Sequence, residues 1–181
     1  MTRPDIQFHM QPLSADKPGE GAHKFSAFTS SVCQLRPYSR GHIEITSPDA
    51  LVYPAIYANY LSDERDHAVV IGGVKVARRI AASPSMAPHI ISEFVPGAQF
   101  QTDAELLDAA RRYSQSIYHP SGTCKMGVDD MAVVDARLRV HGLMNLRVVD
   151  CSIMPEIVSC NTNAPVIMIA EKAADLIRFG N

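Results

Sequence analysis

Two segments in the C-terminal half contain side chains whose types and spacing could do chemistry. The first, YHPSGTCKMG at 118–127, sets His119 before a proline and a glycine turn, which would hold its imidazole rigidly. The second begins with LRVVDCSIMP at 146–155, an apolar run that contains an acid, and continues to NTNAP at 161–165, where two asparagines precede a predicted helix. Histidine is the side chain most often used to accept or donate a proton near neutral pH.

Spacing alone does not separate catalysis from structure in these segments. A single histidine commonly has only a structural role, with its ring nitrogens hydrogen-bonded inside the core. Asparagines in front of a helix commonly cap it. A metal site using His119 with Cys124, or His141 with Cys151, is a further reading, but these spacings match no familiar zinc pattern and no HExxH occurs. The methionines fit core or pocket lining better than ligand roles.

Strands and helices on both sides of these segments must position them. Alternating apolar and polar residues predict strands over 4–13 and 42–46, and a further strand is predicted over 28–35. Three helices are predicted. The first runs from Ser62, which can cap it, to before Pro84. The second runs from about Asp103 to Ser116 after a capping box of Thr102 and Glu105, and the third covers 164–178 with Asn163 as its cap. Short strands are predicted at AVVD (132–135), RLRV (137–140) and LRVVD (146–150). This order predicts an α+β fold, with a mostly antiparallel sheet packed with helices and a C-terminal strand and helix after it.

Length and composition bound the class of protein. The chain has 181 residues, enough for one domain or one domain plus part of another, and 46% of them are hydrophobic. A net charge of −2 gives no reason to expect nucleic acid or an anionic membrane as partner. Four cysteines without a CxxC pair predict reduced thiols in a cytoplasmic protein, and the N-terminus has no signal-peptide pattern. The longest apolar stretch, near 164–170, is far shorter than the roughly 20 residues that span a bilayer.

The two segments also resemble the C-terminal signature of one enzyme family. YHPSGTCKMG, followed by VVDARLRVHGLMNLRVVDCSIMP and NTNAPVIMIAEKAADLI, is similar to the glucose–methanol–choline (GMC) oxidoreductases, and choline dehydrogenase-like members are the nearest match. The similarity extends upstream through DIQFHMQPLSADKPGEG, SVCQLRPYSRGHIEI and the NYL segment, so it covers most of the chain. It implies a substrate-side α+β region over 1–140 and a segment over 141–181 that closes the flavin-binding domain.

The resemblance implies an FAD-dependent enzyme that oxidises an alcohol. His119 matches the family histidine that serves as proton acceptor, and Asn161 matches the second member of the catalytic pair, which is asparagine in some members and histidine in others. The positions where the family chain lies against the flavin are Asp150, Cys151, Thr162 and Asn163, and His9 matches a substrate-contacting histidine. The flavin would accept the hydride, His119 the proton, and Asn161 would donate a hydrogen bond to the substrate oxygen. The N-terminal end of the last helix would face the negative charge of the reduced flavin.

The chain departs from the family pattern in one respect. The GxGxxG turn that binds the ADP part of FAD in complete members is absent from the sequence. We therefore expect a truncated product, an excised fragment or one half of a split enzyme, with weak or no FAD binding and no turnover by itself. The missing N-terminal FAD-binding half would be its partner, and uncovered apolar surface would favour self-association.

A different class of protein is the alternative reading. The chain would then be a non-catalytic remnant that acts as an oligomerisation or binding module, and the motifs would survive as scaffold. The alcohol and the carrier that reoxidises the flavin are left open. A choline pocket needs aromatic faces and an acid, and six Phe, six Tyr and no Trp do not establish one.

Overall fold

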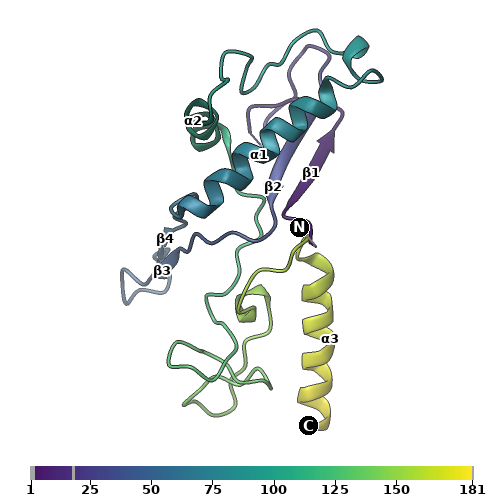
Figure 1. Ribbon diagram of the computed structural model, residues 1–181. Coiled ribbons are helices and arrows are strands. Elements are labelled where there is room, and N and C mark those ends of the chain that lie inside the picture. Colours follow the sequence, from purple (N-terminus) through teal and green to yellow (C-terminus); the bar gives the residue numbers. More distant parts are fainter. Residues whose placement is uncertain (1–2, 18, 181) are drawn as a thin grey trace. The chain divides into compact units, whose positions relative to one another are not determined.

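The chain forms two compact units in the computed structural model, which describes residues 3–17 and 19–180 (Figure 1). The first unit comprises the described residues through Ser39 together with Tyr60–Gln115. The second comprises Arg40–Asn59 together with the described residues from Ser116 onward. The predicted division between residues 140 and 141 concerns a longer, flavin-binding fold, and it stays a prediction.

An antiparallel hairpin and two helices form the first unit. Its elements are β1 (Ile6–Gln11), β2 (Thr29–Gln34), α1 (Glu64–Ala81), the short 3-10 helix η1 (Ala87–His89) and α2 (Asp103–Tyr113). β1 pairs with β2, and the register sets His9 opposite Ser31. A Cβ at Gly73 would overlap Val32 Cγ1, so the packing of α1 on β2 requires glycine there. Leu106 of α2 is 1% exposed and anchors the core of this unit.

Both helices of the first unit begin with acidic side chains of their own. Asp63 caps α1, and its carboxylate accepts a hydrogen bond from the N–H of Arg65 at 3.0 Å. α2 starts with the predicted capping box between Thr102 and Glu105. The predicted cap of α1, Ser62, is wrong by one residue, because the Asp63 carboxylate makes the capping bond.

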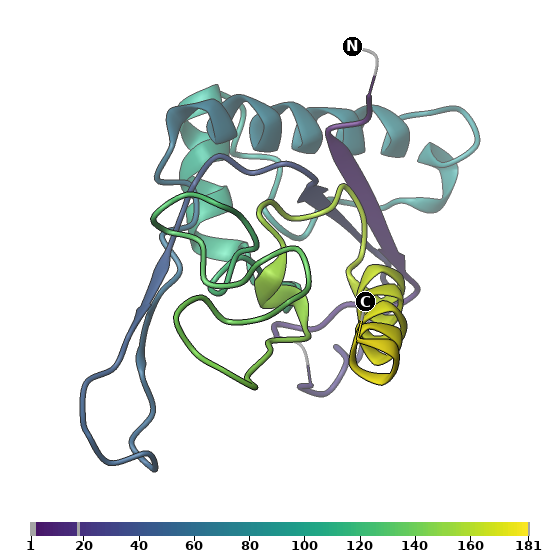
Figure 2. The ribbon, with the colours of Figure 1, turned by 90° about the horizontal axis from the view of Figure 1, so that it is seen from below.

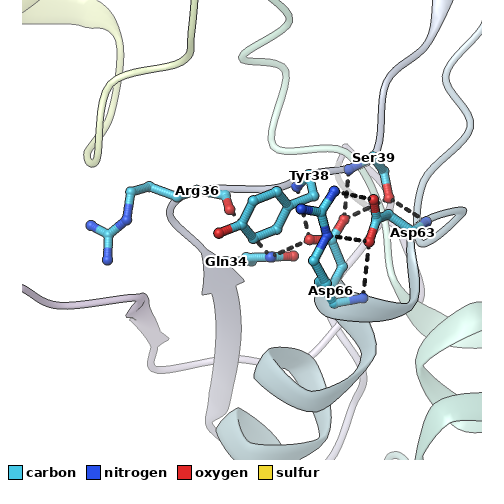
Figure 3. A network of polar contacts seen from close by, with 7 residues as sticks. Gln34, Arg36, Tyr38, Ser39, Asp63 and Asp66 are labelled. Atoms are coloured by element: carbon cyan, nitrogen blue, oxygen red, sulfur yellow. Dashed lines mark hydrogen bonds and ion pairs between the residues drawn. The ribbon is translucent and has the colours of Figure 1, made fainter. Parts of the chain in front are cut away.

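A buried polar network fixes the chain where it leaves the first unit (Figure 3). Asp66 lies in the first turn of α1 and is 1% exposed. Its carboxylate accepts hydrogen bonds from the Gln34 side chain at 2.7 Å and from the backbone N–H of Tyr38 at 2.8 Å. The backbone N–H of Ser39, at 2.8 Å, and the Ser39 hydroxyl also donate to it. Burial raises the pKa of Asp66, but these donors outweigh burial and hold the pKa below its ordinary value.

The second unit combines a small sheet, a long irregular region and a helix. Its elements are β3 (His42–Glu44), β4 (Ala55–Tyr57), the short 3-10 helix η2 (Cys151–Ile153) and α3 (Asn163–Phe179). β3 and β4 pair with each other in antiparallel fashion. The buried core of this unit consists of Val134, Leu138, Ile153, Met154, Ile169 and Ala173. α3 therefore packs one face on the irregular region, and it ends at Gly180, whose backbone is left-handed (φ 68°).

The irregular region differs from the prediction. The strands predicted over 132–135, 137–140 and 146–150 are present only as isolated bridges. Turns interrupt the segments every few residues, as at Asp135, whose carbonyl accepts the N–H of Leu138, so no ladder extends. Asn163 is the first residue of α3, and Thr162 holds the cap position that was predicted for Asn163.

The predicted α+β class is confirmed. The described residues contain two small antiparallel sheets and three α-helices. None of these helices combines the length and apolar character that crossing a bilayer would require.

Candidate functional site

The candidate site lies in the second unit and begins at a constrained turn around His119. Tyr118 has a left-handed backbone (φ 60°), which is uncommon for a residue other than glycine, and Gly122 follows with φ 87°. The N–H of Tyr118 donates to the Ser116 hydroxyl at 3.0 Å. A Cβ on Gly122 would lie only 3.2 Å from the carbonyl oxygen of Met154. These contacts fix the backbone on both sides of His119, whose side chain is half-buried.

Backbone hydrogen bonds join the His119 segment to the segment that contains Asp150. The N–H of Cys124 donates to the carbonyl of Ser152 at 2.9 Å. The Asp150 carboxylate accepts the N–H of Ser152 at 2.7 Å and so starts η2. Asp150 is exposed, and Cys151 is half-buried. The two segments whose side chains could do chemistry are therefore joined by backbone hydrogen bonds.

The side chains of His119 and Asn161 meet directly. Asn161 Nδ2 lies 3.1 Å from His119 Nε2, although the two residues are 42 positions apart in the chain. An amide N–H can only donate, so this contact is a hydrogen bond when Nε2 carries no proton. Asn161 is exposed. An imidazole nitrogen able to accept a proton and an amide donor therefore share one location that solvent can reach.

The start of α3, directly after Asn161, differs from the starts of the other two helices. Thr162 holds the cap position, is 6% exposed and makes no side-chain hydrogen bond to the first turn. The first turn contains no acidic residue, whereas α1 and α2 each place two there. Its positive dipole end is thus not neutralised by a carboxylate of the same turn. Asn163 is exposed at this end, which suits an anionic group.

Six of the seven predicted site residues lie in the second unit, and the seventh, His9, lies on β1 of the first. His9 Nε2 is buried and has no hydrogen-bond partner among the described residues. A buried polar atom without a partner costs free energy, so this nitrogen fits a group that the described chain does not contain. The predicted contact between His9 and substrate stays a prediction.

Two features of the site were missed by sequence reasoning. The left-handed backbone of Tyr118 has no signal in its residue type, because aromatic residues rarely adopt it. The Ser116 hydroxyl that receives the Tyr118 N–H did have a signal, since serine two residues before a turn position commonly makes this bond. All four cysteines are free thiols, and no three His, Cys, Asp or Glu side chains within residues 3–17 and 19–180 gather as metal ligands.

Comparison with known proteins decides the family. The GMC oxidoreductase family model matches residues 37–170, a span that contains both His119 and Asn161. The chain belongs to the GMC oxidoreductase family. The expected resemblance is therefore confirmed, and the similar proteins include an alcohol dehydrogenase, choline dehydrogenases and an FAD-dependent oxidoreductase.

Individual relatives show how much of the fold is shared. The chain is 46% identical over 175 residues to an alcohol dehydrogenase [acceptor] from Pseudomonas putida and to an oxygen-dependent choline dehydrogenase from Acinetobacter baumannii. In both cases the match covers 97% of this chain and 32% of the relative. A formate oxidase of Aspergillus oryzae, in which FAD modification occurs, superposes with a TM-score of 0.91 at 25% identity, over 100% of this chain and 32% of its own. The chain thus spans about one third of the length of these GMC relatives.

Proposed function

We propose that this chain supplies the proton-transfer side of an FAD-dependent oxidation of a small alcohol, with His119 as the base. The observation that carries the proposal is the 3.1 Å contact between Asn161 Nδ2 and His119 Nε2. When Nε2 carries no proton, this contact places a nitrogen that can accept a proton beside an amide donor, and both groups can serve an alcohol oxidation at the substrate hydroxyl.

The chemistry of the pair follows from the donors and acceptors it offers. An alcohol placed against the pair donates its O–H to His119 Nε2, and the Asn161 amide turns its N–H toward the substrate oxygen. As the proton moves to Nε2, negative charge builds on that oxygen and the amide donor stabilises it. When bound, FAD supplies the acceptor for the hydride that leaves the alcohol carbon. The carbonyl product leaves, and the proton remains on His119.

Residues at the starts of η2 and α3 would hold the flavin. The N-terminal end of α3, at Thr162 and Asn163, has no acid in its first turn and would face the negatively charged part of the reduced ring. Asp150 and Cys151 would lie beside the ring. The remaining FAD contacts would come from a polypeptide that carries the GxGxxG turn, which is the partner we propose for this chain.

A chimera tests the proposal. The C-terminal part of the Pseudomonas putida alcohol dehydrogenase that matches this chain is replaced by the chain itself, and the purified chimera is loaded with FAD. We expect a yellow protein whose flavin is bleached without oxygen by at least one small primary alcohol. A chimera that retains FAD and its folded state, and whose flavin no alcohol in a graded series reduces, would contradict the proposal.

A further inference from the structure

The segment that carries His119 contains no regular secondary structure. Residues 116–123 form neither helix nor strand, and Figure 2 shows this stretch as a coil. Within the described chain, no N–H or carbonyl of residues 116–123 takes part in a backbone–backbone hydrogen bond. The next such bond along the chain joins the N–H of Cys124 to the carbonyl of Ser152. The direction of the His119 imidazole is therefore not set by a helix or a sheet that contains this residue.

The backbone of three consecutive residues, 118–120, sets this direction instead. The ring of Pro120 fixes its own φ, and it restricts His119, the residue before it, to an extended backbone. Tyr118 is different, because its left-handed backbone (φ 60°) is unfavourable for an aromatic residue and needs support from its surroundings. Tyr118 is 72% exposed, so packing of its ring supplies little of that support.

The Ser116 hydroxyl supplies the missing support. Its oxygen accepts the N–H of Tyr118 at 3.0 Å, which is the bond by which serine stabilises a turn two residues further on. Ser116 is half-buried. Among the residues that the structure describes, this is the one hydrogen bond made by the backbone of residues 116–123. Without the hydroxyl, Tyr118 could return to an ordinary backbone conformation, and the side chain of the next residue, His119, would turn with it.

We propose that Ser116 is a positioning residue for the base. Its hydroxyl holds Tyr118 in the left-handed conformation that directs the His119 imidazole at Asn161. This direction matters because Asn161 Nδ2 lies 3.1 Å from His119 Nε2, and a hydrogen bond weakens steeply as donor and acceptor lose their alignment. Ser116 takes no proton in this role and acts only through the backbone of Tyr118. The inference rests on the proposed function, because it explains how the base of that reaction is aimed.

Variants of the chimera test the proposal through single-turnover flavin reduction by an alcohol without oxygen. Ser116→Ala should slow reduction by about 10-fold to 10²-fold, because a small displacement of a reacting group has an effect of this size. Flavin content and the unfolding midpoint should be retained. Ser116→Thr keeps the hydroxyl and should retain most of the rate. The matched control is Ser114→Ala, at the exposed cap that ends α2, and it should react at the unmodified rate.

Two further backgrounds separate a positioning role from a merely structural one. In the His119→Ala background, Ser116→Ala should cause no additional loss of rate, because the base through which it acts is already absent. In the Tyr118→Asn background, the loss caused by Ser116→Ala should shrink to less than about 3-fold, because asparagine adopts a left-handed backbone more readily than tyrosine. Comparing rates within one background cancels any direct contribution of the Tyr118 ring.

A second readout needs no flavin. In the isotope-labelled isolated chain, the side-chain amide signals of Asn161 report its contact with His119, and they are identified by their absence in Asn161→Ala. Ser116→Ala should move these NMR signals toward the positions that His119→Ala produces, whereas Ser114→Ala should leave them in place. This measurement tests the positioning directly if a variant of the chimera loses its FAD.

Three outcomes would overturn the inference. The first is an unmodified rate of flavin reduction in Ser116→Ala, and the second is a set of Asn161 signals that Ser116→Ala does not move. The third is an equal loss of rate from Ser116→Ala with and without His119, because the hydroxyl would then act elsewhere. Failure of the proposed function is separate: it would appear as an unmodified rate in His119→Ala, while the Asn161 signals still respond to Ser116→Ala.

Discussion

The polar clusters around Asp66 and around His119 are built in opposite ways. Asp66 is 1% exposed, and its carboxylate accepts four hydrogen bonds from the surrounding chain. The contact between His119 and Asn161 joins a half-buried and an exposed residue, and the helix that follows starts without an acidic side chain. A cluster that satisfies its own buried charge stabilises the fold, whereas an accessible donor–acceptor pair beside an open helix end can serve a ligand. Variants of the first cluster should therefore change stability, and variants of the second should change activity.

The largest effect short of removing the base should come from Asn161. In the chimera, Asn161→Ala should slow alcohol-dependent flavin reduction by about 10²-fold to 10³-fold, because the developing charge on the substrate oxygen loses its donor. Asn161→His should retain more of the rate, since an imidazole N–H can also donate to the substrate oxygen. Stopped-flow absorbance gives the rates, and the unfolding midpoint serves as control. A normal rate in Asn161→Ala would place this amide outside the chemistry.

In the Asp66 cluster the effect should be on stability. Asp66→Asn replaces an acceptor oxygen by an NH₂ group that faces hydrogen-bond donors, so we expect the free energy of unfolding to fall by about 1–3 kcal/mol. Urea unfolding of the isolated chain measures it. Asp175→Asn, at an exposed position of α3, is the matched control and should stay within about 0.5 kcal/mol of wild type. Equal stability of the two variants would show that the buried network is not needed by the fold.

Low pH should destabilise the fold through Asp66. The pKa of Asp66 is lowered in the folded chain, so its stabilising contribution is complete above the ordinary carboxyl pKa of 3.8 and is lost as the pH falls through the lower, folded value. The Arg65 side chain and N–H hold the pKa of Asp63 at about 2, which adds to the loss in the same window. Urea midpoints measured from about pH 5 down to about pH 2 should decline, and more steeply in wild type than in Asp66→Asn. If the urea midpoints of wild type and of Asp66→Asn declined equally with pH, Asp66 would not contribute to the acid response.

The smallest expected effect tests the open start of α3. Asn163→Asp places a carboxylate in a first turn that has none, which should stabilise the isolated chain by about 0.3–1 kcal/mol. The same charge should weaken FAD retention in the chimera, because it would repel an anionic group at that helix end. Ala174→Asp, in the middle of α3 and exposed, is the control for charge alone. Unchanged retention in Asn163→Asp would argue against a flavin at this position.

The features that were predictable from the sequence have local causes. The β1 strand follows from alternation, and the α2 start follows from a capping box contained within four consecutive residues. The GMC motif located His119 and Asn161, but their 3.1 Å contact spans 42 positions and needed the fold to be seen. One other feature depends on distant partners, because the donors to Asp66 come from 27 to 32 residues earlier in the chain. The predicted strands between 132 and 150 do meet neighbours, but turns limit their pairing to isolated bridges.

The most direct test of the central claim is single-turnover flavin reduction by an alcohol, without oxygen, in the chimera carrying His119→Ala. His141→Ala is the matched control, because His141 is an exposed histidine of the same unit whose Nε2 lies 3.1 Å from the carbonyl of Gly127. We predict that His119→Ala slows reduction by about 10²-fold to 10⁴-fold with flavin content and unfolding midpoint retained, and that His141→Ala reacts at the unmodified rate. Reduction by the His119→Ala chimera at the unmodified rate would contradict the role of this imidazole as the base.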